Sequence, residues 1–129
     1  MKNFLFVLSV VFFCSCGTPG ECGGITVDYH KEKGKGSISY ERGGPVMYKG
    51  ALLNGTIVAK VYEQGMDLKK KTCFKDGLRN GPTDLYFFDG KLKSRYMYKD
   101  EKLDGPFEEY DRDGKLIVQG KYKNGTLLL

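Results

Sequence analysis

Hydrophobic and polar residues alternate with a period of two along the C-terminal half of the chain. In the stretch KLIVQGKYK at 115–123, Leu116 and Tyr122 fall on one face of an extended strand and Gln119 falls on the other. The stretch KLKSRYMYK at 91–99 has the same character. Period-two alternation is typical of half-buried antiparallel strands, and no window shows a sustained apolar period of 3.6 residues. The pattern therefore predicts an all-β fold.

The strand pattern recurs with a period of about 24 residues. Four blocks align without gaps: YKGALLNG, FKDGLRNG, YKDEKLDG and YKNGTLLL, which begin at residues 48, 74, 98 and 122. Asn-Gly and Asp-Gly dipeptides accept the positive φ angles that two-residue type I′ hairpins require. We expect such turns at the seven places where these dipeptides occur, which are 54–55, 76–77, 80–81, 89–90, 104–105, 113–114 and 124–125.

Each repeat therefore predicts one β-hairpin, and successive hairpins predict one sheet. A single hairpin is marginal alone, whereas neighbouring hairpins in one sheet stabilise each other. We expect a single-layer antiparallel meander of repeated hairpins over residues 37–129. The first units match the repeat poorly, which suits a terminal cap.

The first sixteen residues, MKNFLFVLSVVFFCSC, have one positive charge, a short apolar stretch and a small-residue exit. These features predict an export signal rather than a permanent membrane span. The ending resembles a bacterial lipoprotein signal, in which Ser15 precedes the acylated residue Cys16. The alternative is a plain signal peptide with incidental cysteines. Residues 17–36, which begin with the Gly- and Pro-rich GTPGECGG, are expected to form a flexible tether and a lead-in to the repeats.

The charge of the chain bears on nucleic-acid binding, and its cysteines bear on disulfide and metal sites. Cleavage before Cys16 removes only the charge of Lys2, so the formal net charge falls from +5 to +4 with both signs mixed along the chain. Nucleic-acid binders usually concentrate basic residues on one face, so no nucleic acid is expected as a partner. Cys22 and Cys73 remain as either a disulfide or two free thiols, and no Cys-x-x-Cys metal spacing occurs.

The sequence nominates no catalytic residues, cofactor or metal site. A lone histidine, His30, lacks the base and orienting partner of a catalytic triad. Glu108 and Glu109 should point to opposite faces of a strand, because successive side chains alternate. The stretch DRDGK at 111–115 lacks the terminal bidentate Glu of a calcium loop. We therefore expect a protein that is not an enzyme.

The repeated motifs are Tyr-Lys-Asp/Asn-Gly, Leu-Asn/Asp-Gly-Pro and Asp-Gly-Lys-Leu, with an aromatic strand between the last two. In these motifs the chain resembles the MORN-repeat variant family, including YwqK-type antitoxin-like proteins, over about residues 48–129. The resemblance implies a β-hairpin array that serves as an interaction surface. Pro82 and Pro106 depart from the original repeat, so the phospholipid binding of some members is not expected to carry over. An antitoxin-like role fits poorly, because an exported protein cannot neutralise a cytoplasmic toxin.

Five tyrosines recur at equivalent or neighbouring strand positions, and they are Tyr86, Tyr96, Tyr98, Tyr110 and Tyr122. They either form the packed face of the sheet or make an exposed strip that binds a partner, because Tyr combines an apolar body with a polar tip. We expect a membrane-anchored scaffold in the bacterial envelope, at the outer membrane or the periplasmic face, that binds another envelope protein. The alternatives are a glycan-binding module and an antitoxin-like partner-binding protein.

Overall fold

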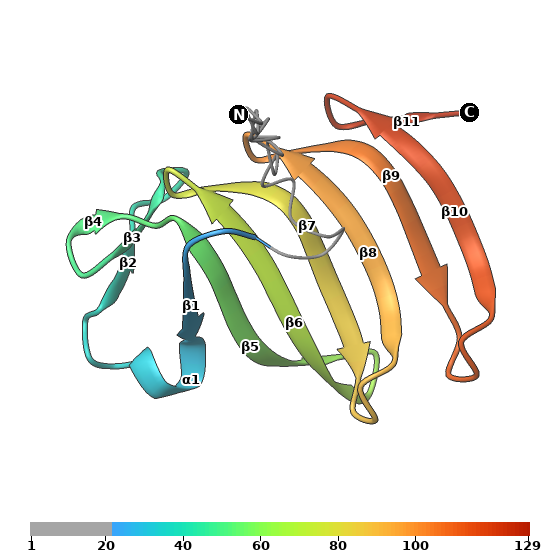
Figure 1. The fold of residues 1–129 in the computed structure, drawn as a ribbon, viewed down its shortest axis with the longest axis horizontal. Helices are drawn as coiled ribbons and strands as arrows, with labels where there is room; N and C mark the ends of the chain where they lie inside the picture. Colours follow the sequence, from blue (N-terminus) through green and yellow to red (C-terminus); the bar gives the residue numbers. More distant parts are fainter. Residues whose placement is uncertain (1–21) are drawn as a thin grey trace, which may run out of the picture.

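The computed structural model describes residues 22–129, which form mostly β-strands with almost no helix, so the predicted all-β class is confirmed. The signal at 1–16, Cys16 and the start of the tether lie outside the described residues. The main sheet has eight strands in the order β1-β5-β6-β7-β8-β9-β10-β11 (Figure 1). The strands that carry the repeats are β5 (Gly55–Glu63), β6 (Met66–Lys75), β7 (Leu78–Phe87), β8 (Leu92–Lys99), β9 (Lys102–Tyr110), β10 (Leu116–Lys123) and β11 (Thr126–Leu128).

The N-terminal part departs from a simple meander. Strand β1 (Ile25–Asp28) pairs parallel to β5, within the stretch expected to be tether and lead-in. Gly55 permits this pairing, because a Cβ atom there would lie 2.0 Å from the carbonyl oxygen of Ile25. The helical turn α1 (Tyr29–Glu32) follows, and Asp28 caps its N-terminus. An antiparallel pattern alone does not predict this parallel edge strand.

A second, three-stranded sheet consists of β2 (Ile38–Tyr40), β3 (Val46–Tyr48) and β4 (Ala51–Leu52). It is tied to the main sheet through backbone hydrogen bonds. The Val46 N–H donates to the Gly77 carbonyl at 2.7 Å, and the Gly77 N–H donates to the Leu53 carbonyl at 2.8 Å. The degenerate first unit therefore forms a separate sheet that packs beside a hairpin turn.

The Gly dipeptides have three different structural roles. Asp76-Gly77 and Asn124-Gly125 form two-residue turns with positive φ at both residues, as predicted. The dipeptides at 89–90 and 113–114 lie in the longer connections that follow β7 and β9. The prediction of turns at 80–81 and 104–105 was wrong, because both dipeptides lie inside strands. It was also wrong at 54–55, because Asn54 is not in a turn and Gly55 is the first residue of β5.

The dipeptides at 54–55, 80–81 and 104–105 supply side chains that hydrogen-bond to the next turn between repeats. The N–H of Asp76 donates to the Asn54 side chain at 3.0 Å, and the N–H of Asn124 donates to the Asp104 side chain at 3.2 Å. Between them, the side chain of Asn80 donates to Asp100 at 3.1 Å. Each of these turns is therefore hydrogen-bonded to a residue at or near the start of the strand that begins the preceding unit.

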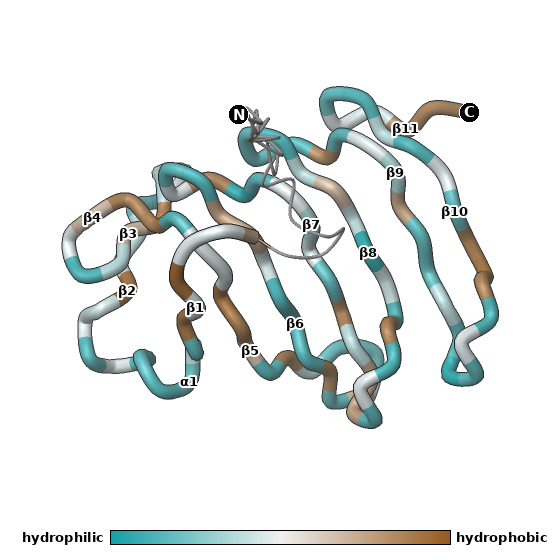
Figure 2. Tube along the Cα trace, viewed as in Figure 1, coloured by the Kyte–Doolittle hydropathy of each residue, from teal (hydrophilic) through white to brown (hydrophobic). Residues whose placement is uncertain are grey.

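The main sheet is a single layer with a small core. Among residues 22–129, the buried hydrophobic core consists of Val27, Leu53, Leu68, Cys73, Phe87 and Phe107. Figure 2 shows hydrophobic positions scattered between polar ones along most strands, without one continuous apolar band. About half of the strand residues are only half-buried. Side-chain pairs between neighbouring strands therefore supply much of the stability of this sheet.

Candidate interaction faces of the sheet

The five sequence-predicted tyrosines are divided between the two faces of the sheet. Thr83, Tyr96 and Phe107 are paired in register across β7, β8 and β9. Asp84 and Arg95 form the next pair, so their side chains point to the other face. Tyr96, Tyr98 and Tyr122 share the first face, whereas Tyr86 and Tyr110 lie on the second. The five tyrosines therefore do not form one continuous strip.

We call the first surface the aromatic face and define it by Arg79, Tyr96, Tyr98, Phe107 and Tyr122. The rings of Tyr96 and Phe107 are stacked, with centroids 5.2 Å apart, and the ring of Tyr122 lies 5.1 Å from that of Phe107. The guanidinium of Arg79 lies 4.3 Å from the ring centroid of Tyr98. Phe107 is buried, while the three tyrosines are half-buried. The cluster thus combines a packed centre with solvent-accessible tyrosine edges.

Two details fix the rings of this face. The hydroxyl of Tyr96 donates a hydrogen bond to Glu109. Burial, and then this bond to the carboxylate, raises the pKa of Tyr96. Gly120 lies beneath the ring of Phe107, because a Cβ atom there would be 2.6 Å from a ring carbon. The absence of a side chain at this position in β10 therefore lets Phe107 lie flat against the sheet.

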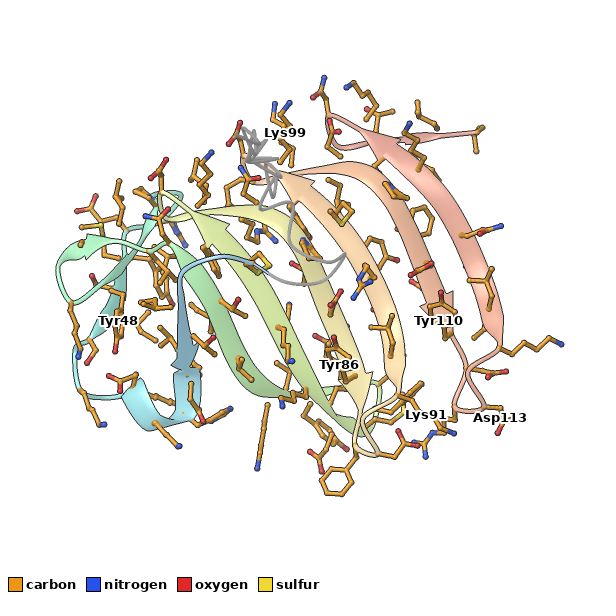
Figure 3. All side chains as sticks on the ribbon, in the orientation of Figure 1. Tyr48, Tyr86, Lys91, Lys99, Tyr110 and Asp113 are labelled. Atoms are coloured by element: carbon orange, nitrogen blue, oxygen red, sulfur yellow. A yellow bond between two sulfur atoms is a disulfide. The ribbon has the colours of Figure 1, made fainter. Side chains whose placement is uncertain are left out.

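We call the opposite surface the polar face and define it by Asp84, Tyr86, Arg95, Glu108 and Tyr110. Arg95 bonds both carboxylate oxygens of Asp84 at 2.8 Å, and Asp84 is only 2% exposed. The hydrogen bonds to Asp84 raise the pKa of Arg95. Burial, followed by the nearby Asp84 charge, raises the pKa of Tyr86, whose hydroxyl donates to Asp84 at 3.1 Å. A hydrogen bond to Glu108 raises the pKa of Tyr110; Figure 3 labels Tyr86 and Tyr110 along β7 and β9.

The N-terminal segment crosses the polar face. A disulfide joins Cys22 to Cys73 in β6, with the two Cα atoms 5.7 Å apart. Cys22 and Asp84 line the same pocket, together with side chains of β5 and β6. The hydroxyl of Thr56 donates to the Cys22 sulfur at 3.0 Å. Part of the polar face is therefore covered by the chain itself, and the chain enters the repeats from this side.

The remaining candidates of the sequence analysis are His30, a metal site and a membrane-spanning segment. His30 is exposed, and its Nε2 accepts the backbone N–H of Lys60 at 2.9 Å, which caps the outer side of β5 beyond β1. Within residues 22–129, no group of three or more His, Cys, Asp or Glu side chains is placed to hold a metal ion. In the same range, no helix has the length and apolar character needed to cross a bilayer.

Four residues of the two faces were missed by sequence reasoning. Asp84 and Arg95 are eleven residues apart, and only the strand register brings them together. Phe107 and Arg79 are single residues without a local motif. The sequence offered one signal for these four residues, which is their position in the repeat. The Leu-Asn/Asp-Gly-Pro motif lies at the start of β7 and of β9, and this shared position determines which residues of neighbouring strands face each other.

Residues 103–124 match the model of the MORN repeat variant family. The matched stretch covers most of β9 and all of β10, including Phe107 and Tyr122 of the aromatic face and Gly120 beneath the Phe107 ring. The repeat indicates a protein-binding or membrane-associated repeat domain, and repeats of this family are generally non-catalytic. Comparisons with curated proteins and with solved structures gave no match.

Proposed function

We propose that this chain is a non-catalytic scaffold, held at the bacterial cell envelope by a lipid on Cys16, that binds another envelope protein through its aromatic face. The observation that carries the proposal is the cluster of Tyr96, Tyr98, Phe107 and Tyr122 on one side of a single-layer sheet. No second layer of strands or helices covers that side among the described residues.

The composition of the aromatic face favours a protein partner. Tyr and Arg are, with Trp, the residue types most enriched in the energetic centres of protein interfaces, whereas Lys, Glu and Asp are depleted there. Arg79 lies against Tyr98, so this face offers a flat aromatic area with one cation at its margin. Tyrosine also has few rotatable bonds, so little conformational entropy is lost when it is buried by a partner.

The disulfide supports export and limits the distance from the anchor. Disulfides persist in oxidising compartments, so the bond between Cys22 and Cys73 suits an exported protein. Cys16 precedes Cys22 by six residues. Six residues of fully extended chain span at most about 22 Å, so a lipid on Cys16 would keep β6 close to the membrane surface.

Labelling with a fatty acid tests the anchor. We expect label on the wild-type protein and none on Cys16→Ala, with Cys14→Ala as the matched control that keeps its label. One acyl chain alone gives reversible membrane binding, so the two or more chains of a bacterial lipoprotein would be needed for stable anchoring. Unprocessed, unlabelled protein in the cytoplasm would refute export and would restore the antitoxin-like alternative.

Paired substitutions on the two faces test the binding surface. We expect a partner isolated with the wild-type protein to be lost from Tyr98→Ala/Tyr122→Ala and kept by Tyr86→Ala/Tyr110→Ala. Each pair removes two half-buried tyrosine rings, so the two variants are matched in the area that they delete. Equal loss from both variants would show that general destabilisation, and not the aromatic face, explains the effect.

A glycan remains the second candidate ligand, and one observation favours the polar face for it. Tyr86 and Tyr110 lie beside Asp84, Arg95 and Glu108, so aromatic rings and hydrogen-bonding groups alternate there. Sugars are bound by stacking and by polar groups of this kind. Retention on peptidoglycan that is lost in Tyr86→Ala/Tyr110→Ala and kept in Tyr98→Ala/Tyr122→Ala would support the glycan and exclude the aromatic face as its site.

A further inference from the structure

The two edges of the eight-stranded sheet differ in how far other parts of the chain cover them. The β5 edge is covered by β1, and beyond β1 the imidazole of His30 accepts the N–H of Lys60. On the other side, β11 pairs only with residues 121–123 of β10. Residues 116–120 of β10 therefore have no strand on their outer side within the described part of the chain.

This uncovered edge is also apolar, because three successive aliphatic side chains are exposed along it. Leu116 is 41% exposed, Ile117 is 62% exposed and Val118 is 43% exposed. Figure 2 shows these hydrophobic positions together along one end of β10. Unpaired backbone groups beside exposed aliphatic side chains are a template for an added strand.

The repeat itself shows what such an edge accepts. Strand β8 is the equivalent of β10 one repeat earlier, and its outer side pairs antiparallel with β9. Tyr96 is opposite Phe107, Arg95 is opposite Glu108, and Ser94 is opposite Glu109. β8 has the same register shift against β7 that β10 has against β9, and the outer pairing of β8 with β9 begins at Ser94, directly beyond this shift.

We propose that residues 116–120 bind a short extended segment of a partner protein by antiparallel β-strand addition, and that this segment has an aromatic residue followed by carboxylates. The aromatic side chain would lie opposite Gly120, where β10 has no side chain of its own, and would extend the aromatic face by one ring. The carboxylates would lie opposite Gln119 and Val118. The lysines Lys115 and Lys121 flank the edge and favour an acidic occupant.

A second copy of this chain fits the edge poorly. Two β10 strands paired antiparallel about Val118 would place Lys115 opposite Lys121 twice, and opposed like charges are unfavourable. β11 also occupies the same side of β10, so the β11 of the second copy would meet residues 113–115 of the first. The free edge is therefore long enough for a peptide of about five residues and too short for a whole second sheet.

The experiment uses the purified full-length chain and a labelled peptide, GPFEEY, that copies residues 105–110 of β9. We expect saturable binding by fluorescence anisotropy and slower amide hydrogen exchange at 116–120. The charge-reversed peptide GPFKKY and a scrambled peptide should bind at least about tenfold more weakly, since one close charge pair in an interface is worth about that factor or more.

Matched variants locate the site. Ile117→Asp should weaken the binding of GPFEEY about tenfold or more, because it places a carboxylate at the edge that receives the glutamates. Ile25→Asp adds the same charge to the exposed side chain of β1 at the opposite end of the sheet, and it should leave binding unchanged. Both side chains are exposed, so both variants should fold, which circular dichroism checks.

Two outcomes would overturn the proposal. One is equal binding of the native and charge-reversed peptides, or binding that survives Ile117→Asp. The other is a concentration-dependent dimer in sedimentation that Ile117→Asp dissociates, because this would assign the edge to a second copy. Neither outcome bears on the aromatic face, whose substitutions lie on β8 and the far end of β10.

Discussion

Arg95→Met should be among the most damaging single substitutions in the repeat domain. The side chain of Arg95 donates two hydrogen bonds of 2.8 Å to Asp84, and Asp84 is only 2% exposed. Without Arg95, the carboxylate stays buried with the Tyr86 hydroxyl as its remaining side-chain partner. Removal of one member of a buried ion pair typically costs about 3–5 kcal/mol of unfolding free energy. Urea unfolding, followed by tyrosine fluorescence because the chain has no Trp, measures this loss.

The repeat supplies the matched control. Val58 occupies in β5 the position that Asp84 occupies in β7, so an aliphatic residue is compatible with this place in a strand. The double variant Asp84→Val/Arg95→Met removes both charges at once. Apolar replacement of a buried pair is often neutral or stabilising. The lost acceptor of Tyr86 costs about 1 kcal/mol, so the double variant should be clearly more stable than Arg95→Met alone.

Two results would refute this explanation of the pair. A loss below about 1 kcal/mol in Arg95→Met would mean that solvent screens Asp84 as it screens a surface charge. A double variant no more stable than Arg95→Met would mean that the aliphatic part of the Arg95 side chain, and not its charge, stabilises the sheet.

Three further predictions concern single residues. Gly120→Ala should cost about 1–3 kcal/mol of unfolding free energy, because a Cβ atom would overlap the Phe107 ring; a loss near zero would mean that the ring can move aside. Cys73→Ser should cost about 4 kcal/mol in the chain-entropy model for a bond that spans 51 residues, and faster hydrogen exchange in β1 should accompany it, whereas unchanged exchange would show that β1 is held without the disulfide. Tyr96 has a raised pKa, so its contribution to stability is complete below about pH 10 and declines at higher pH; the alkaline loss of stability should be smaller in Tyr96→Phe, and identical pH profiles would contradict this.

The strands and their period could be predicted because both depend on local sequence patterns. Alternation of apolar and polar residues identifies each strand, and the repeated motifs identify the 24-residue unit. The roles of the Gly dipeptides could not be predicted in the same way. Asn80-Gly81 and Asp76-Gly77 are locally alike, yet the first lies inside β7 and the second forms a turn. Contacts between repeats decide which role each dipeptide takes.

The division of the tyrosines between two faces also depends on long-range structure. The sequence places Tyr96 and Tyr98 on one side of their own strand. It does not place Tyr86 relative to them, because that relation depends on the register of β7 against β8, which shifts between Leu85 and Tyr86. The parallel strand β1 was missed for a related reason, since its pairing depends on the close approach that Gly55 permits. Local pattern therefore predicts the sheet but not the composition of its faces.

Photo-crosslinking in living cells tests the proposed binding face most directly. A photoreactive phenylalanine analogue at position 98 samples the aromatic face, and the same analogue at position 86 samples the polar face through a side chain of similar burial. We expect one discrete adduct with an envelope protein from position 98 and none from position 86. No adduct from position 98, or the same adduct from both positions, would contradict a partner bound at the aromatic face.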